Sequence, residues 1–372
     1  MNRRQVLIGG GVMAAGVAGA TAFSFSRTGS MTDYAAAVAA QREALAANPG
    51  FADLVRFATL AANGHNTQPW RFQFDQRRIA IRPDFMRRTP AVDPDDHHLF
   101  VSLGCAVENL ALAAAAGGRR GEPRFDSEEG GAVVFEFSAG RPERSSLFEA
   151  IPKRQSTRSD YDGRSVAAAD LATLASAARV PGVDLVLLTD RPRIEQLLDL
   201  VIAGNRAQMA DPAFMRELKH WIRFNPRQAL ETDDGLFSAA TGNPTAPTWL
   251  GRLMFDLAFQ VAAENERYAR QIRSSAGIAI FVSERADKAH WVQAGLACQR
   301  FALQATALGL KHAFVNQPVE VAALRPALAG LIGMTGRRPD LVMRFGYGAP
   351  MPYSARRSVS EVISDGVQLP RD

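Results

Sequence analysis

The 372-residue sequence contains only two cysteines, Cys105 and Cys298, and no spaced cluster of cysteine and histidine. A disulfide framework, which needs several paired cysteines, is therefore excluded. The absence of CxxC and HExxH motifs removes the common zinc signatures, so no metal is expected. Both cysteines lie in apolar stretches with helical spacing, and we predict that they are buried thiols with a packing role.

The sequence also lacks a large excess of positive or negative charge. Lysine and arginine number 43 against 38 acidic residues, which gives a formal charge of +5. The arginines are scattered, and no basic run is interleaved with aromatic residues, so nucleic acid is not an expected partner. No Gly-x-Ser-x-Gly segment suggests a serine hydrolase. The composition, 47% hydrophobic and 22% charged, is globular, and the basic surplus favours a small anionic ligand.

The N-terminus contains an apolar run, Val6 to Ala20, that is too short for a comfortable transmembrane helix. Arg3-Arg4 precede it, and Ala20-Thr21-Ala22 matches a signal-peptidase site. The pair followed by Gln5-Val6-Leu7 resembles a twin-arginine signal. We therefore expect residues 1–30 to be a signal peptide and the mature protein to be periplasmic or in the cell envelope, without a stable membrane span. An ordinary secretory signal and an uncleaved anchor remain alternatives.

The most informative stretch is residues 61–70, AANGHNTQPW. It follows a helical pattern over 51–60, and Gly64 is expected to end that helix with a left-handed backbone. The amides of Asn66 and Gln68 each carry donors and acceptors, which suit the edge of a planar heterocycle. Pro69-Trp70 and a strand pattern over 71–74 then fix the loop on a rigid frame. The alternative is a polar loop whose amides bond its own backbone.

Two alanine-rich helical segments, 104–118 and 295–309, repeat one another at a constant offset of 191. Both have little polar face, so each is predicted to be a buried central helix. A strand pattern follows each of them, over 132–137 and 341–345. Chance similarity between alanine-rich helices is the alternative.

A second match, between residues 52–54 and 169–171, has an offset of 117, so the second copy contains an insertion of 191 − 117 = 74 residues. Most of it is expected at about 205–252. Leu236, Phe237, Trp249 and Leu250 in this segment need apolar surface to bury, which argues against disorder. The predicted fold class is α+β, with related halves at 31–140 and 141–372.

Basic residues occur in two short motifs. Arg154, Ser156 and Arg158 alternate, so an extended backbone would point all three to one side, as a phosphate or polyol clamp requires. Arg356-Arg357 form a second basic pair near the C-terminus. Either motif alone is weak evidence, because arginine-rich loops are often only solvated.

Together, Arg154-x-Ser156-x-Arg158, Asn66-x-Gln68-Pro69-Trp70 and the C-terminal basic pair resemble the nitroreductase superfamily of FMN-dependent oxidoreductases. The double length, export signal and insertion are most similar to its Acg-type branch. Family members form homodimers with two FMN sites at the interface, each built from both subunits. Here one set of motifs is divided between the halves. The resemblance thus implies a nitroreductase-like fold, an intramolecular pseudo-dimer and one FMN.

The resemblance also implies cofactor-binding residues, whereas catalytic residues stay unassigned. Asn316, Gln317 and Pro318 follow the second central helix, where relatives place a loop beside the flavin ring, although Val321 replaces the usual glycine. The full predicted set is Asn63, Gly64, His65, Asn66, Gln68, Arg154, Ser156, Arg158, Asn316, Gln317, Pro318, Arg356 and Arg357.

The function implied is two-electron reduction of a small electrophilic substrate, such as a nitroaromatic or quinone-like molecule. An alternative is a non-catalytic protein of the cell envelope that sequesters or stores FMN beneath a lid formed by the insertion. A weaker alternative is a solute-binding protein that has lost flavin. The expected partners are FMN, the substrate and the twin-arginine export machinery. A chain with one complete site can function as a monomer.

Residues 93–98, Asp-Pro-Asp-Asp-His-His, superficially suggest a metal site. Neighbouring residues of this kind are expected to be too adjacent to converge on one ion. Acidic residues and Asp-Pro are common at helix starts. We therefore interpret the segment as the beginning of a helix.

Overall fold

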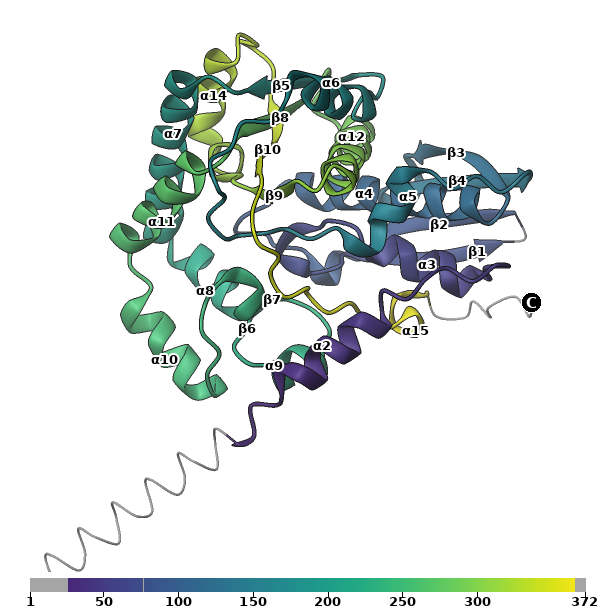
Figure 1. The fold of residues 1–372 in the computed structure, drawn as a ribbon, viewed down its shortest axis with the longest axis horizontal. Coiled ribbons are helices and arrows are strands. Elements are labelled where there is room, and N and C mark those ends of the chain that lie inside the picture. The colour runs from purple at the N-terminus through teal and green to yellow at the C-terminus, as the bar shows by residue number, and fades with distance from the viewer. Residues whose placement is uncertain (1–25, 76, 365–372) are drawn as a thin grey trace, which may run out of the picture.

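The computed structural model describes residues 26–75 and 77–364, so residues 1–25 of the predicted signal peptide, including its twin arginines and apolar run, lie outside the described residues. Two four-stranded antiparallel sheets organise the chain (Figure 1). The first sheet has the order β1-β2-β4-β3 and the second has the order β5-β8-β10-β9. The strands of the first sheet are β1 (Trp70–Asp75), β2 (Arg78–Pro83), β3 (Arg119–Asp126) and β4 (Ala132–Ala139). Those of the second are β5 (Val183–Leu188), β8 (Gly277–Ser283), β9 (Lys311–Phe314) and β10 (Pro339–Gly346).

The two sheets have equivalent topologies, because replacing β1, β2, β3 and β4 by β5, β8, β9 and β10 converts one order into the other. In each half a long helix stands between the second and third of these strands: α4 (His97–Ala116) and α12 (Lys288–Ala307). A shorter helix precedes the first strand, α3 (Phe51–Thr59) in one half and α6 (Ala168–Ala177) in the other. The predicted α+β class with two related halves is therefore confirmed.

The central helices α4 and α12 pack against each other with a very close approach. A Cβ atom added to Gly104 would lie 2.1 Å from the carbonyl oxygen of Val292, and one added to Gly295 would lie 2.1 Å from that of Val101. Only glycine permits this contact, since it leaves room for the facing backbone. Helix α4 is long and apolar enough to cross a membrane by composition, but 83% of its most apolar window is buried inside the protein. Both cysteines are buried and unpaired, as predicted.

A buried polar chain joins the two central helices to the end of α3. The Gln299 side chain donates from Nε2 to Asn109 Oδ1 at 2.7 Å, and Asn109 Nδ2 donates to the Phe57 carbonyl at 3.0 Å. Gln299 Oε1 accepts from the Ala62 amide at 3.3 Å. Each amide group thus has partners despite complete burial, which fixes the position of residue 62 relative to both halves.

The halves differ most between their first two strands. In the first half β1 ends at Asp75 and β2 begins at Arg78, whereas residues 189–276 connect β5 and β8. We call residues 189–276 the insertion; it is longer than the predicted 205–252. It contains α7 (Arg191–Ala210), α8 (Pro212–Trp221), β6 (Ile222–Arg223), α9 (Pro226–Thr232), β7 (Leu236–Phe237), α10 (Thr248–Ala258) and α11 (Val261–Arg273).

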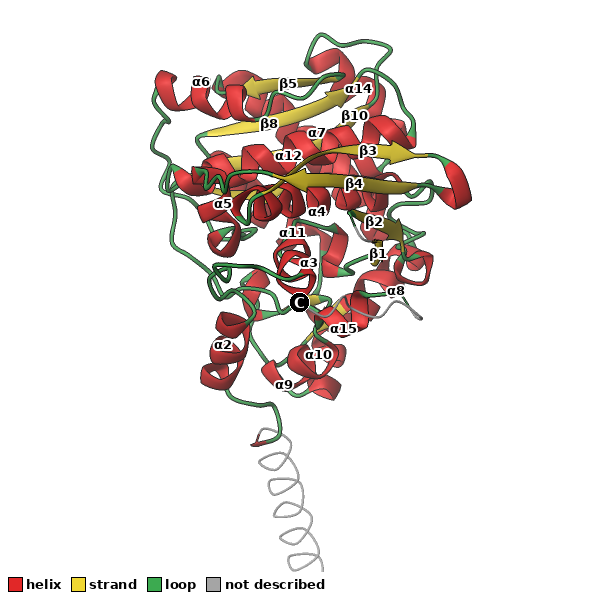
Figure 2. Ribbon diagram, turned by 90° about the vertical axis from the view of Figure 1, so that its right-hand side faces the viewer, coloured by secondary structure: helices red, strands yellow, loops and turns green. Residues whose placement is uncertain are grey.

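The insertion is folded and forms a separate apolar cluster with the beginning and end of the described chain. Tyr34 and Val38 of α2 (Met31–Ala40) pack with Ala229, Phe237 and Ala355. Figure 2 shows α2, α9 and α10 together at one end of the molecule, away from the two sheets. The remaining helices are α5 (Ser146–Ala150), α13 (Gln317–Glu320), α14 (Arg325–Leu331) and α15 (Val359–Val362).

Candidate functional site

Two cavities share part of their walls at the seam between the halves. One has a volume of about 210 Å³ and the other about 50 Å³. Ala62, Asn63, Arg158 and Leu236 line both, so the cavities adjoin. We call the larger one the wide cavity and the smaller one the basic cavity. The first half, the second half and the insertion all contribute to these shared walls.

Four arginines line the basic cavity: Arg42, Arg154, Arg158 and Arg356. Among the described residues, no carboxylate side chain joins them in its lining. Burial lowers the pKa of all four guanidiniums, in the case of Arg42 to about 9. Repulsion from neighbouring arginines lowers the pKa of Arg42 and Arg356 further. An anion in this cavity would offset both effects, because opposite charge favours the protonated form.

Backbone carbonyls at the C-terminal end of α3 position two of these arginines. Arg154 donates from Nη2 to the Leu60 carbonyl at 3.0 Å, and Arg356 donates from Nε to the Thr59 carbonyl at 2.7 Å. The last carbonyls of a helix have no partner within the helix and form the negative end of its dipole. The helix end therefore holds both guanidiniums, and Arg154 keeps further donors that no described residue accepts.

Several guanidinium donors of the arginines that line the basic cavity have no hydrogen-bond partner within the described part of the chain. They are Nε and Nη1 of Arg154 and Nε of Arg42, all fully buried. Ser156 and Ser354 add hydroxyl groups to the same lining. Buried guanidinium donors without partners are costly, and a phosphate or other multidentate oxyanion would satisfy them.

The amide loop before β1 has an unusual backbone. His65, Asn66 and Gln68 adopt positive φ angles of 48°, 54° and 53°. Gly64 does not, so the expectation of a left-handed backbone at that glycine is wrong. Helix α3 ends at Thr59, and its C-cap residue, Leu60, has a right-handed conformation. Non-glycine residues in the left-handed region cost roughly 1 kcal/mol each, so surrounding contacts must hold this loop in place.

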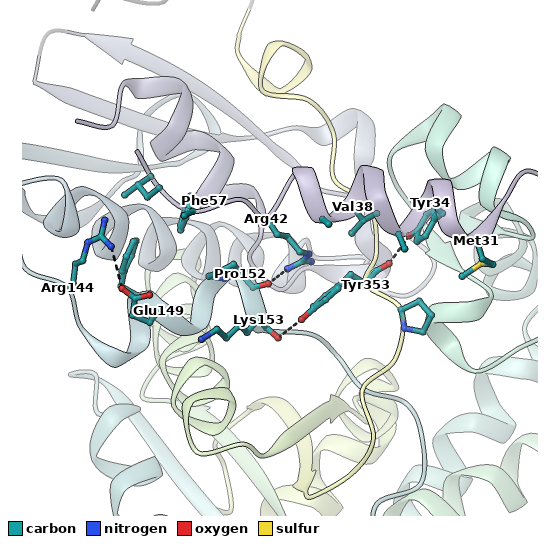
Figure 3. Close-up of a pocket in the computed structure, with 16 residues that line it drawn as sticks. Met31, Tyr34, Val38, Arg42, Phe57, Arg144, Glu149, Pro152, Lys153 and Tyr353 are labelled. Carbon is teal, nitrogen blue, oxygen red and sulfur yellow. Dashed lines mark hydrogen bonds and ion pairs between the residues drawn. The ribbon is translucent and has the colours of Figure 1, made fainter. Parts of the chain in front are cut away.

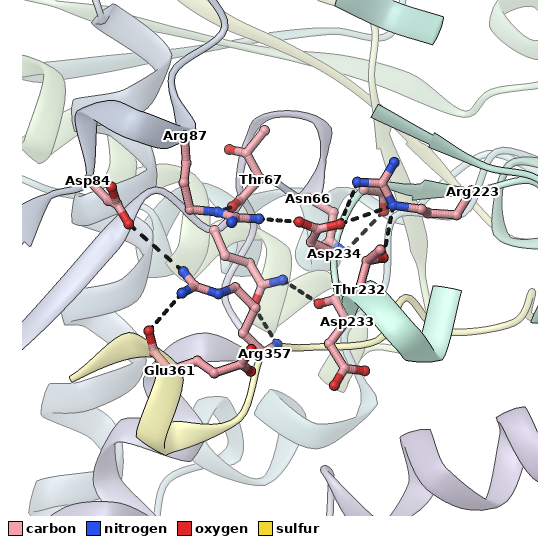
Figure 4. Close-up of polar contacts among 12 residues, drawn as sticks. Asn66, Thr67, Asp84, Arg87, Arg223, Thr232, Asp233, Asp234, Arg357 and Glu361 are labelled. Carbon is pink, nitrogen blue, oxygen red and sulfur yellow. Dashed lines mark hydrogen bonds and ion pairs between the residues drawn. The ribbon is translucent and has the colours of Figure 1, made fainter. Parts of the chain in front are cut away.

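Those contacts come from Asn66 and Gln68 (Figure 4). Asn66 donates from Nδ2 to the carbonyls of Gly235 and Ala355, both at 3.1 Å, and accepts from Arg356 at 2.7 Å. Gln68 donates to the Asp233 carbonyl at 2.7 Å and accepts from the Arg357 amide at 2.9 Å. Both side chains thus bond the backbone of other segments, and they join the loop to the insertion and to the C-terminal segment.

The structure brings ten of the thirteen predicted site residues to the cavities. Asn63, Gly64, His65, Asn66, Arg154, Ser156, Arg158, Asn316, Gln317 and Arg356 line one cavity or both. The other three, Gln68, Pro318 and Arg357, are not in either lining.

The Arg357 side chain lies outside the cavities because consecutive residues of an extended segment point in opposite directions. Its Nη2 donates to the Glu361 carbonyl at 2.7 Å, and its Nη1 lies 4.0 Å from Asp84. Arg356 therefore faces the basic cavity and Arg357 does not, which corrects the expectation that both would bind the ligand. Arg42 replaces it as the fourth cavity arginine, a role that could not be predicted because an isolated arginine forms no pattern in the sequence.

The wide cavity has a mixed lining with polar groups that lack partners. His65 Nδ1 and Gln317 Oε1 have no hydrogen-bond partner among the described residues. Burial lowers the pKa of His65 to about 4, so its imidazole is neutral at pH 7. Burial also raises the pKa of Glu320 in the same lining. The neutral imidazole of His65 and the amide of Gln317 can hydrogen-bond the edge of a polar ring without adding charge.

The insertion covers the wide cavity with apolar side chains. Met209, Phe214, Leu218 and Phe259 contribute to the lining from this segment. Their role in lining a cavity could not be predicted from the sequence, because apolar residues at helical spacing are more often core residues.

An ionic cluster fastens the insertion to the first half beside these cavities (Figure 4). Asp234 accepts from Arg223 at 3.0 Å and 2.5 Å and also pairs with Arg87. Arg87 in turn bonds the Thr67 carbonyl in the amide loop. Asp234 and Arg223 are buried, and Arg87 is the member that belongs to the first half. We call Arg87, Arg223 and Asp234 the latch.

A larger cavity of about 710 Å³ lies between α2 and the segment around α5 (Figure 3). Its walls are mainly apolar, with Val38, Phe57 and Tyr353 among them. Arg42 borders it, but that guanidinium already donates to the Pro152 carbonyl at 3.0 Å. Arg42 Nε is the one buried polar side-chain atom without a partner among the described residues that line this cavity, so the smaller pair of cavities is the better candidate site.

Asp93, His97 and His98 come together, contrary to the expectation that such close neighbours cannot converge. One potential ligand atom from each lies within 4.8 Å of the other two. These side chains nevertheless have structural partners. Asp93 accepts from the amides of His98 and Leu99 at 3.0 Å and so caps α4, as predicted for a helix start. His97 Nε2 lies 2.9 Å from Asp340 in a buried pair.

No protein-family model matches the chain. It is 26% identical over 321 residues to the putative NAD(P)H nitroreductase Rv3131 of Mycobacterium tuberculosis, covering 83% of this chain and 90% of the relative. It is 24% identical over 330 residues to the putative NAD(P)H nitroreductase acg of the same organism, covering 83% and 93%. Over most of its length, the chain is therefore similar to nitroreductases.

Solved structures give a weaker likeness. A nitroreductase with bound FMN from Desulfitobacterium hafniense has a TM-score of 0.37 at 12% identity, covering 57% of this chain and 94% of that one. The FMN-dependent nitroreductase NfnB from Mycobacterium smegmatis, in complex with NADPH, has a TM-score of 0.36 at 12% identity, covering 61% and 94%.

Proposed function

We propose that this protein is an FMN-dependent oxidoreductase of the nitroreductase type that reduces small electrophilic molecules, such as nitroaromatics or quinone-like compounds. The observation that supports this most is the group of four arginines in the basic cavity, two buried and two half-buried, with no acidic side chain among the described residues of its lining. The similarity to curated nitroreductases over 83% of the chain supports the same class of reaction.

The residues present fit FMN at both ends. Arg154 and Arg42 have buried donors without partners, which a phosphate would satisfy, and Ser156 supplies a hydroxyl for the phosphate or polyol. In the adjoining wide cavity, His65 Nδ1 and Gln317 Oε1 can meet the alternating carbonyl and N–H groups of a flavin ring. The order of these groups supports an orientation with the phosphate in the basic cavity and the ring in the wide cavity.

Bound FMN would supply the two-electron chemistry, and the protein would supply position and electrostatics. Arg154, Arg158 and Arg356 would neutralise the phosphate end. The neutral His65 would orient the ring edge without contributing charge. The apolar side chains Phe214, Leu218 and Phe259 would exclude water from the wide cavity.

Replacing Arg154 with alanine should weaken binding of FMN more than binding of riboflavin, because its orphan donors serve the phosphate. The loss of charge-assisted hydrogen bonds should cost on the order of 1.5–3 kcal/mol for FMN. Fluorescence titration of both ligands measures the difference. Arg357→Ala is the matched control and should leave both affinities nearly unchanged, since that side chain is outside the cavities. Equal losses for FMN and riboflavin in Arg154→Ala would contradict the assignment.

A second candidate function is FMN sequestration or storage without turnover. The specific observation in its favour is the insertion, which covers the wide cavity and is fastened by the latch. A lid that remains closed would hold the flavin while excluding substrates and reductants. Whether the latch opens therefore separates the two candidates.

The variant Arg87→Met should loosen the insertion, because it removes the ion pair to the first half while Asp234 keeps its partner Arg223. Stopped-flow reduction of bound FMN by dithionite should become faster. Glu231→Gln, which removes an exposed ion pair within the insertion, is the control. Faster flavin reduction together with faster nitroaromatic turnover supports an oxidoreductase limited by its lid, and faster reduction without turnover supports sequestration. Unchanged reduction would show that the insertion does not act as a lid.

We also propose export by the twin-arginine route to the periplasm or cell envelope, supported by Arg3-Arg4, the apolar run and the small residues at Ala20-Thr21-Ala22. This route transports folded proteins, which suits a protein that acquires its cofactor before export. The double variant Arg3→Lys/Arg4→Lys should retain the precursor in the cytoplasm in cell fractionation. Undiminished export of this variant would refute the assignment.

A further inference from the structure

Helix α10 of the insertion has an exposed apolar face. Its large exposed side chains are Trp249, Leu253, Met254 and Leu257, with exposed fractions of 54%, 47%, 43% and 67%. Trp249, Leu253 and Leu257 recur every four residues and so form one stripe, with Met254 beside it. Trp249 was predicted to be buried because of its large apolar side chain, but it is exposed in the structure. Exposed apolar groups concentrated on one helix indicate an interaction surface.

The opposite face of α10 explains why the stripe remains outside. Gly251 packs so closely on Phe224 that an added Cβ would lie 2.3 Å from its ring. Phe255 is buried and stacks on Phe259 with ring centroids 4.8 Å apart. These contacts orient α10 with one face toward the protein, and they hold the Trp249 stripe toward solvent. The stripe is thus a fixed feature of the fold.

Positive charge borders the stripe. Arg252 is exposed on α10, and Arg27, Arg227 and Arg252 line a shallow depression together with Trp249. Among the described residues of that lining, Glu231 is the one acidic side chain, and it pairs with Arg227 at 2.8 Å. On α10 itself Asp256 is paired with Lys219 at 2.6 Å. The surroundings of the stripe therefore retain a positive surplus.

The N-terminal end of the described chain enters at the same place. The Thr28 carbonyl accepts from the Arg227 amide at 2.9 Å, and Figure 1 shows α2, α9 and α10 at the same end of the molecule. In the sequence, the apolar run Val6 to Ala20 ends shortly before Ser26, where the described residues begin. Until the predicted signal peptide is removed, a segment suited to lipid therefore precedes in the sequence the residues that lie beside Trp249 and the arginines.

We infer that this face docks on the surface of an anionic lipid membrane, with α10 lying in the interfacial plane. An amphipathic helix with tryptophan and aliphatic residues on one side and arginine at its border suits that environment. A symmetric contact with a second copy is disfavoured, because it would bring the same arginines face to face. The inference does not depend on the proposed flavin chemistry.

Co-sedimentation with phosphatidylglycerol vesicles tests this docking, with phosphatidylcholine vesicles for comparison. All proteins share the same N-terminus, so differences between variants report on α10 alone. Leu253→Ser/Leu257→Ser should reduce binding to phosphatidylglycerol roughly tenfold or more, because two apolar side chains no longer enter the interface. Arg252→Glu should weaken binding and reduce its salt dependence. Met86→Ser, which removes a 92% exposed apolar side chain elsewhere, should bind like wild type.

Tryptophan fluorescence gives an independent readout. Vesicles should shift the emission to shorter wavelength in wild type, and Trp249→Phe should lose this shift while still sedimenting. Equal vesicle binding by wild type and the Leu253→Ser/Leu257→Ser variant would overturn the inference. So would a wild-type dimer in light scattering that the same double variant converts to a monomer, since the stripe would then be a contact between copies.

Discussion

The need to hold several buried guanidiniums close together constrains the whole seam between the halves. Arg42, the 154–158 segment with its two arginines, and Arg356 are far apart in the sequence, and burial lowers the pKa of all four guanidiniums. Repulsion from other cavity arginines lowers the pKa of Arg42 and Arg356 further. The carbonyls at the end of α3 partly compensate this charge. An anion would compensate the rest of this positive charge, so the arrangement favours binding of a ligand that carries a phosphate.

The amide loop connects the arginines of the basic cavity to the insertion and to the C-terminal segment. Asn66 bonds Arg356 and the insertion at once, and Gln68 bonds the insertion and the backbone of Arg357. The loop keeps three left-handed residues because these partners hold it. The arginines, the loop and the insertion therefore form one connected unit. A ligand in the basic cavity would stabilise the closed insertion, and an open insertion would weaken ligand binding.

The sequence predicted the repeated halves well, because the small-residue pattern around Gly104 and Gly295 reflects a packing requirement that both copies share. It also identified Arg154 and Ser156, since alternation in an extended segment has a fixed geometric meaning. It failed for Arg357, whose direction depends on the placement of the C-terminal segment. It missed Arg42 and the convergence of Asp93 with His97, because both depend on tertiary contacts. The exposure of the stripe on α10 could not be predicted either, because helical periodicity does not show which face of a helix is covered.

Calorimetric titration of ligand-free protein with FMN tests the central claim most directly, because the claim concerns both the number of sites and their charge. One basic cavity at the seam predicts a single site per chain, with FMN bound much more tightly than riboflavin. Two equivalent FMN sites per chain, or equal affinity for FMN and riboflavin, would contradict the account.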